Sequence, residues 1–235
     1  MKVFSVLALA TAATIFGAAP ASAADVVGSS TGVFVNALPA TAITTGSGTS
    51  SFTFGSAFDS VGVGSLSFVA SSFSANFNSS FKLGTLNYFN GTTVFGTDIN
   101  SVDLAIGLKF SVPPIAPAVS NFNLTLINSP NVGTPDENAD FVFFNGAQTL
   151  TPFLINGIAY NVTISGFGNV IGDGFLTSDS TQFRVREGKS ATADLFGVVS
   201  VASAVPEPTS LALLGLGLVG IAAGRRAKKR KLEAA

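Results

Sequence analysis

The chain has 235 residues, of which 47% are hydrophobic and 11% are charged, and its formal net charge is −1. It contains neither cysteine nor histidine, which excludes disulfides, Cys-His and Ser-His-Asp mechanisms, and zinc sites built on those side chains. The segment from Ala24 to Val205 has five basic and eleven acidic residues, a net charge of −6. We expect no nucleic-acid partner, because phosphate groups repel such a segment.

The first 23 residues are predicted to be a secretory signal peptide. Lys2 precedes an apolar stretch over residues 3–16, and Ala21-Ser22-Ala23 supplies the small side chains that signal peptidase recognises. We expect cleavage after Ala23 and export of the remaining chain. An uncleaved N-terminal anchor is the alternative, although the apolar run is short for a membrane span.

Residues 24–48 are small, polar and interrupted by glycine and proline. They are predicted to be an N-terminal extension that holds one early strand, over residues 32–36. The domain itself is predicted to occupy residues 49–203.

The predicted domain consists of short strands. The chain has 22 Phe and 25 Gly, and helix formers are scarce in its middle, a composition that favours strands joined by turns. Segment 101–112 alternates hydrophobic and other residues without a break. Further strands are predicted within residues 50–55, 64–73, 81–89, 120–128, 139–146, 151–168, 181–188 and 192–202.

Strict alternation buries one face of a strand and leaves the other in water, as in antiparallel sheets. Eight or more such strands closed by Gly and Asn turns predict an all-β fold, an antiparallel β-sandwich with jelly-roll-like topology. Asn90-Gly91 and Asn156-Gly157 are two-residue hairpin signals. The sequence shows no sustained 3.6-residue period and no fixed repeat, which disfavours a helical domain and a β-helix.

Residues 128–140, NSPNVGTPDENAD, form a dense acidic loop. Asp136, Glu137 and Asp140 offer the hard oxygen ligands that Ca²⁺ prefers and are candidate calcium ligands. Their spacing does not match an EF-hand loop. The alternative interpretation is a solvated turn in which Asp and Asn side chains cap local N–H groups.

Two further patterns match catalytic or phosphate sites only in part. The glycine-rich stretch 166–175 lacks the lysine of a phosphate-binding loop and is interpreted as a turn. Asp98 and Asp103 flank one strand, but nothing places a carboxylate pair across a cleft as a glycosidase requires. The chain has no Trp and two Tyr, which counts against sugar-stacking enzymes and avid lectins. We therefore expect no enzymatic activity.

The C-terminal segment has three parts. Val205-Pro206-Glu207-Pro208 precedes an apolar run over residues 210–224, and a block of basic residues follows, namely Arg225, Arg226, Lys228, Lys229, Arg230 and Lys231. As a helix, the apolar run covers about 22 Å, whereas the hydrocarbon core of a bilayer is about 30 Å thick. The basic block stays on the cytoplasmic side, so the domain lies outside. We interpret the run as a temporary hold of the precursor in the inner membrane.

These three parts, in this order, resemble the PEP-CTERM sorting signal of Gram-negative bacteria, here over residues 205–231. The resemblance implies that an exosortase, a membrane-embedded protease or transpeptidase, cuts near residues 206–208 and releases or re-anchors the protein. Glu207 would then belong to a recognition element rather than act as a catalytic acid. The family accompanies exopolysaccharide production in biofilm-forming bacteria, which implies exopolysaccharide as a partner.

The segment over residues 50–202 resembles the choice-of-anchor ectodomains that precede such signals, most closely the K type. The resemblance rests on FKLGTLNYFNGTT, SVDLAIGLKF, LTLINSPNVGTPDENADFVFF and GIAYNVTISGFG. It implies surface display and brings no catalytic residues. The sequence therefore predicts an exported, non-enzymatic protein of the cell surface or the extracellular matrix. A calcium-assisted glycan-binding module and a permanently membrane-anchored domain are the alternatives.

Overall fold

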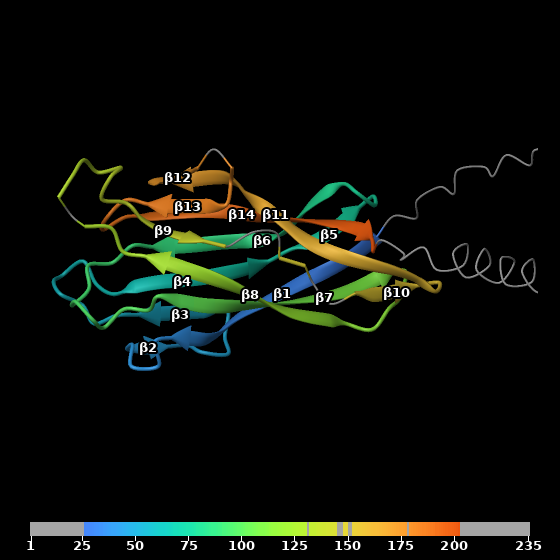
Figure 1. Ribbon diagram of the computed structural model, residues 1–235, viewed down its shortest axis with the longest axis horizontal. Helices are drawn as coiled ribbons and strands as arrows, with labels where there is room; N and C mark the ends of the chain where they lie inside the picture. Colours follow the sequence, from blue (N-terminus) through green and yellow to red (C-terminus); the bar gives the residue numbers. More distant parts are fainter. Residues whose placement is uncertain (1–25, 131, 145–147, 150–151, 178, 203–235) are drawn as a thin grey trace, which may run out of the picture.

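A computed structural model describes residues 26–130, 132–144, 148–149, 152–177 and 179–202. These residues fold into two antiparallel sheets of seven strands each, which curl and pack face to face along the long axis of the molecule (Figure 1). The antiparallel β-sandwich predicted from the sequence is confirmed. The finer prediction of jelly-roll-like topology stays a prediction, and the predicted signal peptide and C-terminal helix lie outside the described residues.

The spatial order of the strands within each sheet differs from their order along the chain. Sheet A contains, from one edge to the other, β12 (Gly174–Leu176), β13 (Gln182–Val185), β9 (Asp140–Phe143), β8 (Ala118–Ile127), β7 (Ser101–Val112), β1 (Val26–Leu38) and β5 (Ser72–Ala75). Sheet B contains, in the same manner, β10 (Phe153–Ile155), β11 (Ile158–Gly172), β14 (Ser190–Val201), β6 (Ser80–Phe89), β4 (Gly64–Ala70), β3 (Ser51–Phe54) and β2 (Thr44–Thr45).

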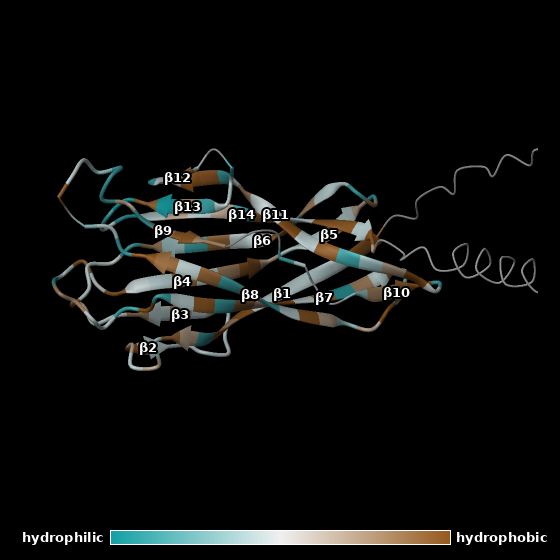
Figure 2. Cartoon of the chain, in the orientation of Figure 1, coloured by the Kyte–Doolittle hydropathy of each residue, from teal (hydrophilic) through white to brown (hydrophobic). Residues whose placement is uncertain are grey.

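Strand β7 shows why the alternating sequence forms this fold. Every second side chain from Val102 to Phe110 is buried between the sheets, and the residues between them are partly or fully exposed. The same alternation of hydrophobic and polar positions is visible along the other long strands (Figure 2). One face of each sheet therefore supplies the core, as the pattern predicts.

The N-terminal boundary differs from the one predicted. Strand β1 begins at Val26 and lies between β7 and β5 in sheet A, so residues 26–38 belong to the sandwich and not to an extension. Val26 and Phe34 are fully buried. The alternation in this segment is hidden because glycine and serine occupy many of its positions, and their small side chains carry little hydrophobic signal.

The two predicted hairpin signals behave differently. Asn156 and Gly157 adopt φ angles of 50° and 81° and join β10 to β11, which confirms a two-residue turn of the type that needs positive φ at both positions. The hairpin predicted at Asn90-Gly91 is wrong, because β6 ends at Phe89 and the next strand, β7, lies in the other sheet.

Pairs of phenylalanine rings join the two sheets through the core. Each pair takes one ring from sheet A and one from sheet B, with ring centroids 4.7–5.9 Å apart, the range in which aromatic pairs attract. The pairs are distributed along the sandwich and consist of Phe34–Phe52, Phe73–Phe81, Phe110–Phe153 and Phe183–Phe167.

Glycine makes room for these rings. Phe68 of β4 is 4% exposed, and its ring lies against Gly32 of sheet A and Gly84 of sheet B, so closely that a Cβ at either glycine would overlap the ring. Phe54 lies in the same way over Gly64, and Phe183 over Gly174. At these four glycines the missing side chain leaves the room that a phenyl ring fills.

We expect Gly84→Ala to lower the free energy of unfolding by about 1–3 kcal/mol, the usual cost of overpacking a core. The new methyl group would overlap the Phe68 ring and lie 2.7 Å from the Val69 carbonyl oxygen. Gly107→Ala in β7 is the matched control, because its close contact there is the hydroxyl of Thr31, an exposed side chain that can rotate. Chemical denaturation measures both variants, and an equal loss at the two positions would contradict this account.

Candidate functional site

The loops at one end of the sandwich lie opposite the end at which the described chain begins and finishes. Strand β1 begins and strand β14 ends on the right of Figure 1, whereas the loops that follow β1, β3, β6, β8 and β13 are on the left. We call the latter group the loop end and define it as residues 39–43, 55–63, 90–100, 128–140 and 186–189. Its sequence contains six acidic and two basic residues, so most of the acidity of the domain gathers here.

Backbone hydrogen bonds fasten the loops of the loop end to one another. Phe58 N donates to Thr92 O at 2.9 Å, and Val94 N donates to Ser56 O at 2.8 Å. The loop that follows β1 joins this frame through Ile43 N, which donates to Thr97 O at 3.0 Å. Loops fastened in this way hold their side chains in defined positions.

Asn90 connects the end of β6 to the turn between β13 and β14. Its side chain is 2% exposed, and its Nδ2 donates to Val185 O at 3.1 Å. Its backbone N donates to Lys189 O at 3.0 Å, and its backbone O accepts from Gly188 N at 2.8 Å. The residue predicted to form a hairpin thus links the two sheets at the loop end.

Three carboxylates lie near one another within this frame. Asp98 Oδ2 accepts from Thr93 Oγ1 at 2.5 Å and from Asn128 Nδ2 at 3.3 Å, while its Oδ1 is buried and has no hydrogen-bond partner among the described residues. Glu187 Oε1 accepts from Thr92 Oγ1 at 3.1 Å. The third carboxylate is that of Asp140.

Asp140 is 5% exposed and shares a cavity of about 20 Å³ with Asp98 and Tyr88. Burial raises the pKa of the Asp140 carboxyl to about 7, and the charges of Glu187 and Asp98 also raise it. The hydrogen bonds from Ser129 N and from the Asn90 side chain act in the opposite direction. Burial likewise raises the pKa of Tyr88 well above its usual value, with the same three acids adding to the shift.

A groove of about 580 Å³ opens to solvent beside these acids. Its lining comes from the loops that follow β1, β6, β8 and β13 and includes Thr92, Thr93, Phe95, Asp98, Asn128 and Glu187. Asp140 lines the cavity behind the groove but not the groove itself. The groove therefore combines hydroxyl, amide and carboxylate groups with one phenyl ring.

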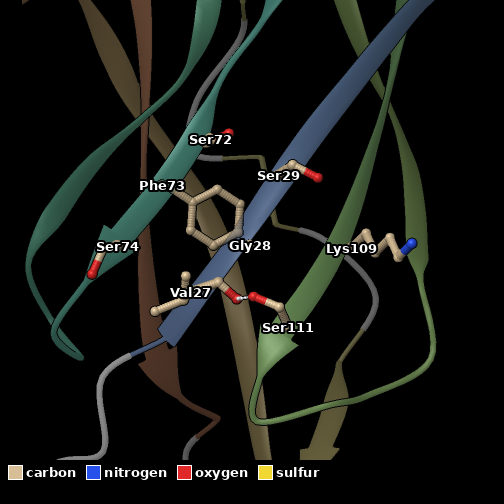
Figure 3. A pocket seen from close by; sticks show the side chains of 8 residues that line it. All are labelled: Val27, Gly28, Ser29, Ser72, Phe73, Ser74, Lys109 and Ser111. Atoms are coloured by element: carbon tan, nitrogen blue, oxygen red, sulfur yellow. Dashed lines mark hydrogen bonds between the residues drawn. The ribbon is translucent and has the colours of Figure 1, made fainter.

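A second hollow, of about 680 Å³, lies on sheet A near the opposite end, over β1, β5 and β7 (Figure 3). A Cβ at Gly28 would overlap the Lys109 carbonyl oxygen and lie 2.7 Å from Cζ of Phe73, so position 28 has no room for a side chain. Its polar lining consists of serines and Lys109, and the Ser111 hydroxyl already donates to Val27 O at 3.1 Å. This hollow offers less varied chemistry than the groove.

The three predicted calcium ligands have separate partners. Asp136 Oδ1 forms an ion pair with Arg186 Nε at 2.6 Å, Glu137 Oε2 accepts from Thr134 N and Oγ1 at 2.8 Å, and Asp140 is buried behind the groove. The backbone N–H of Thr134, followed by its hydroxyl, lowers the pKa of Glu137. Among the described residues, no group of three or more acidic side chains is placed to hold a metal ion. Calcium binding by this loop stays a prediction.

The structure also shows where the other residues singled out from the sequence lie. Asp103 accepts from Asn36 and Asn123 on the outer face of sheet A, away from Asp98 in the groove. Residues 166–175 are mainly strand, since β11 runs to Gly172 and β12 begins at Gly174, and Asp173 forms the turn between them. The residues of the predicted signal peptidase site and of the predicted sorting signal lie outside the described part of the chain.

The last described residue leads directly into the C-terminal segment with its Pro-Glu-Pro, apolar and basic parts. Residues 204–229 match the PEP-CTERM protein-sorting motif. The motif implies an exported protein that an exosortase processes and sorts to the cell surface. The match does not extend into the sandwich, so the choice-of-anchor resemblance stays a prediction. No curated protein matches the chain.

The predicted membrane helix over residues 210–224 is outside the described residues. Within the described residues, no helix has the length and apolar character needed to cross a bilayer.

Phe95, Glu187 and Asn128 were not singled out from the sequence. The groove residues come from loops about 30 to 150 positions apart, and only the pairing of the strands brings them together. In the structure Phe95 and Gly96 lie in a turn, and the Phe95 ring is exposed there.

We expect the free energy of unfolding of the parent protein to fall as the pH rises. In the Asp140→Asn variant this fall should be absent. The folded pKa of about 7 exceeds the unfolded value of about 3.9, so the folded state binds the additional proton between these values and its stability falls as the pH rises through them. The loss is at most about 4 kcal/mol, since each pKa unit corresponds to about 1.4 kcal/mol.

Denaturant unfolding at pH 5 and pH 8 measures this difference. The parent should lose more stability between the two values than Asp140→Asn, whose amide oxygen still accepts from Ser129 N. Equal pH dependence of the two proteins would contradict the assignment.

Proposed function

We propose that this chain is a non-enzymatic protein of the cell surface or the extracellular matrix, associated with exopolysaccharide. It is made as a precursor that residues 210–224 hold in the inner membrane. An exosortase then cuts near Pro206–Pro208, after signal peptidase has removed residues 1–23. The observation that carries the proposal is the sorting motif at residues 204–229, and the resemblance of residues 50–202 to choice-of-anchor ectodomains agrees with surface display.

The position of the sorting motif on the sandwich supports display of the loop end. Strand β14 ends at Val201, on the side of the molecule opposite the loop end (Figure 1). A tail attached there holds the sandwich by one end, so that the acidic loops face away from the attachment point. This arrangement suits a protein whose distal surface meets other molecules.

Two observations support the absence of enzymatic activity. The chain has no histidine or cysteine, the usual general base and thiol nucleophile. The Asp140 carboxyl has a pKa of about 7, a value that suits acid–base chemistry. However, Asp140 is 5% exposed, and its carboxylate accepts a hydrogen bond from Ser129 N. A catalytic acid has to reach its substrate, and Asp140 lies behind the wall of the groove.

Two epitope tags, one inserted before Pro206 and one after Lys231, test the processing step in the producing cells. We expect the tags to separate, with the first on a surface or released product and the second on a small membrane-associated fragment. A Pro206→Ala, Glu207→Ala, Pro208→Ala variant, which lacks the motif, should keep both tags on one inner-membrane species.

Both tags on one species in the parent protein would contradict exosortase processing. That result would instead support the alternative of a permanently anchored domain.

A further inference from the structure

The groove at the loop end has the chemistry of a site for a polyhydroxylated ligand. Its lining includes the hydroxyls of Thr92, Thr93 and Ser129 and the amides of Asn100 and Asn128. The three hydroxyls donate to Glu187, Asp98 and Ala139 O, and their oxygens can still accept hydrogen bonds. The volume of about 580 Å³ is within the range of small-ligand sites, about 300–1,000 Å³. Loops that hydrogen-bond to one another form its walls, so the site exists before a ligand arrives.

Phe95 gives the groove an aromatic surface. Its side chain is fully exposed, at 101% of the reference area, whereas the Phe residues of the core are 9% exposed or less. The backbone around it is held in place, since Val94 N donates to Ser56 O and Thr97 N donates to Val94 O. An exposed ring on a hydrogen-bonded turn beside a polar groove can stack on the apolar face of a sugar or lie beside a cation.

The negative charge of the groove favours a positively charged ligand. Asp98 and Glu187 are in its lining, and no Lys or Arg is among the described residues that line it. Arg186, which is close in sequence, pairs with Asp136 at 2.6 Å, and Lys189 is exposed outside the lining. Asp140 stands behind the wall, beside both acids. A groove of this kind repels anionic polymers and attracts amines.

The position of the groove argues against a peptide ligand. Extended peptides are commonly bound by adding a strand to a sheet edge. The groove is formed instead by loops at the ends of the strands, and none of the edge strands β2, β5, β10 and β12 contributes to its lining.

We propose that this groove binds a glycan segment that carries free amino groups, with a sugar ring stacked on Phe95 and an ammonium group held by Asp98 and Glu187. The inference goes beyond the proposed sorting and display, because it names the ligand of the loop end and does not depend on cleavage of the tail. If the groove bound no such glycan, the proposed function as an exported surface protein would still stand.

A titration of the purified full chain with a fluorescently labelled oligomer of β-1,4-linked glucosamine tests the proposal. The comparison ligand is the fully N-acetylated oligomer, which has the same backbone but no ammonium group. We expect the glucosamine oligomer to bind at least about tenfold more tightly, the effect of one charge-assisted hydrogen bond, and its affinity to fall with added salt.

Four variants locate the site. Phe95→Ala should weaken binding about fivefold through the lost ring contact, and Glu187→Gln about tenfold through the lost charge. Phe58→Ala is the control for the ring, since Phe58 is 72% exposed on the neighbouring loop and does not line the groove. Asp59→Asn is the control for the charge, since Asp59 is exposed on that same loop.

Both controls should bind within about twofold of the parent, because surface substitutions away from the site change little. Thermal unfolding of each variant confirms that it is folded. Equal affinity for the two oligomers, unchanged binding by Phe95→Ala and Glu187→Gln, or an equal loss in the two controls would each overturn the proposal.

Discussion

The structure depends on the packing of phenylalanine rings in the places where glycine leaves room between two sheets. Rings from sheet A and sheet B meet in pairs along the core, and Phe68 occupies the space that Gly32 and Gly84 leave between them. A sandwich packed in this way needs neither disulfides nor a metal for its core, which agrees with a chain that has no cysteine.

The long strands that carry this core separate the two ends of the molecule. One end of the sandwich holds the start of β1 and the end of β14, and the sequence after β14 contains the sorting motif, residues 204–229. The other end holds loops that are fastened to one another and that bring Asp98, Asp140 and Glu187 close together, with Phe95 at the rim. The attachment and the recognition that we propose are therefore placed at opposite ends of one sandwich.

Local patterns predicted much of the fold and little of the site. The alternation in residues 101–112 and the turn at Asn156-Gly157 depend on neighbouring residues alone, and both were confirmed. Residues 24–48 were assigned to an extension with a strand only over residues 32–36, because glycine and serine hide the alternation of β1. Asn90-Gly91 has the composition of a hairpin, but the contacts of Asn90 with Val185, Gly188 and Lys189 decide its structure. The groove is built from contacts between residues that are far apart in the sequence, so no single stretch of sequence predicted it.

The most direct measurement is a crystal structure of the protein grown with a glucosamine oligomer, because it shows where the ligand lies. The account predicts a sugar ring stacked on Phe95, with its amino nitrogen within hydrogen-bond distance of the carboxylates of Asp98 or Glu187. A sugar bound only in the serine-lined hollow over β1, β5 and β7, or an empty groove at saturating oligomer, would contradict the assignment of recognition to the loop end.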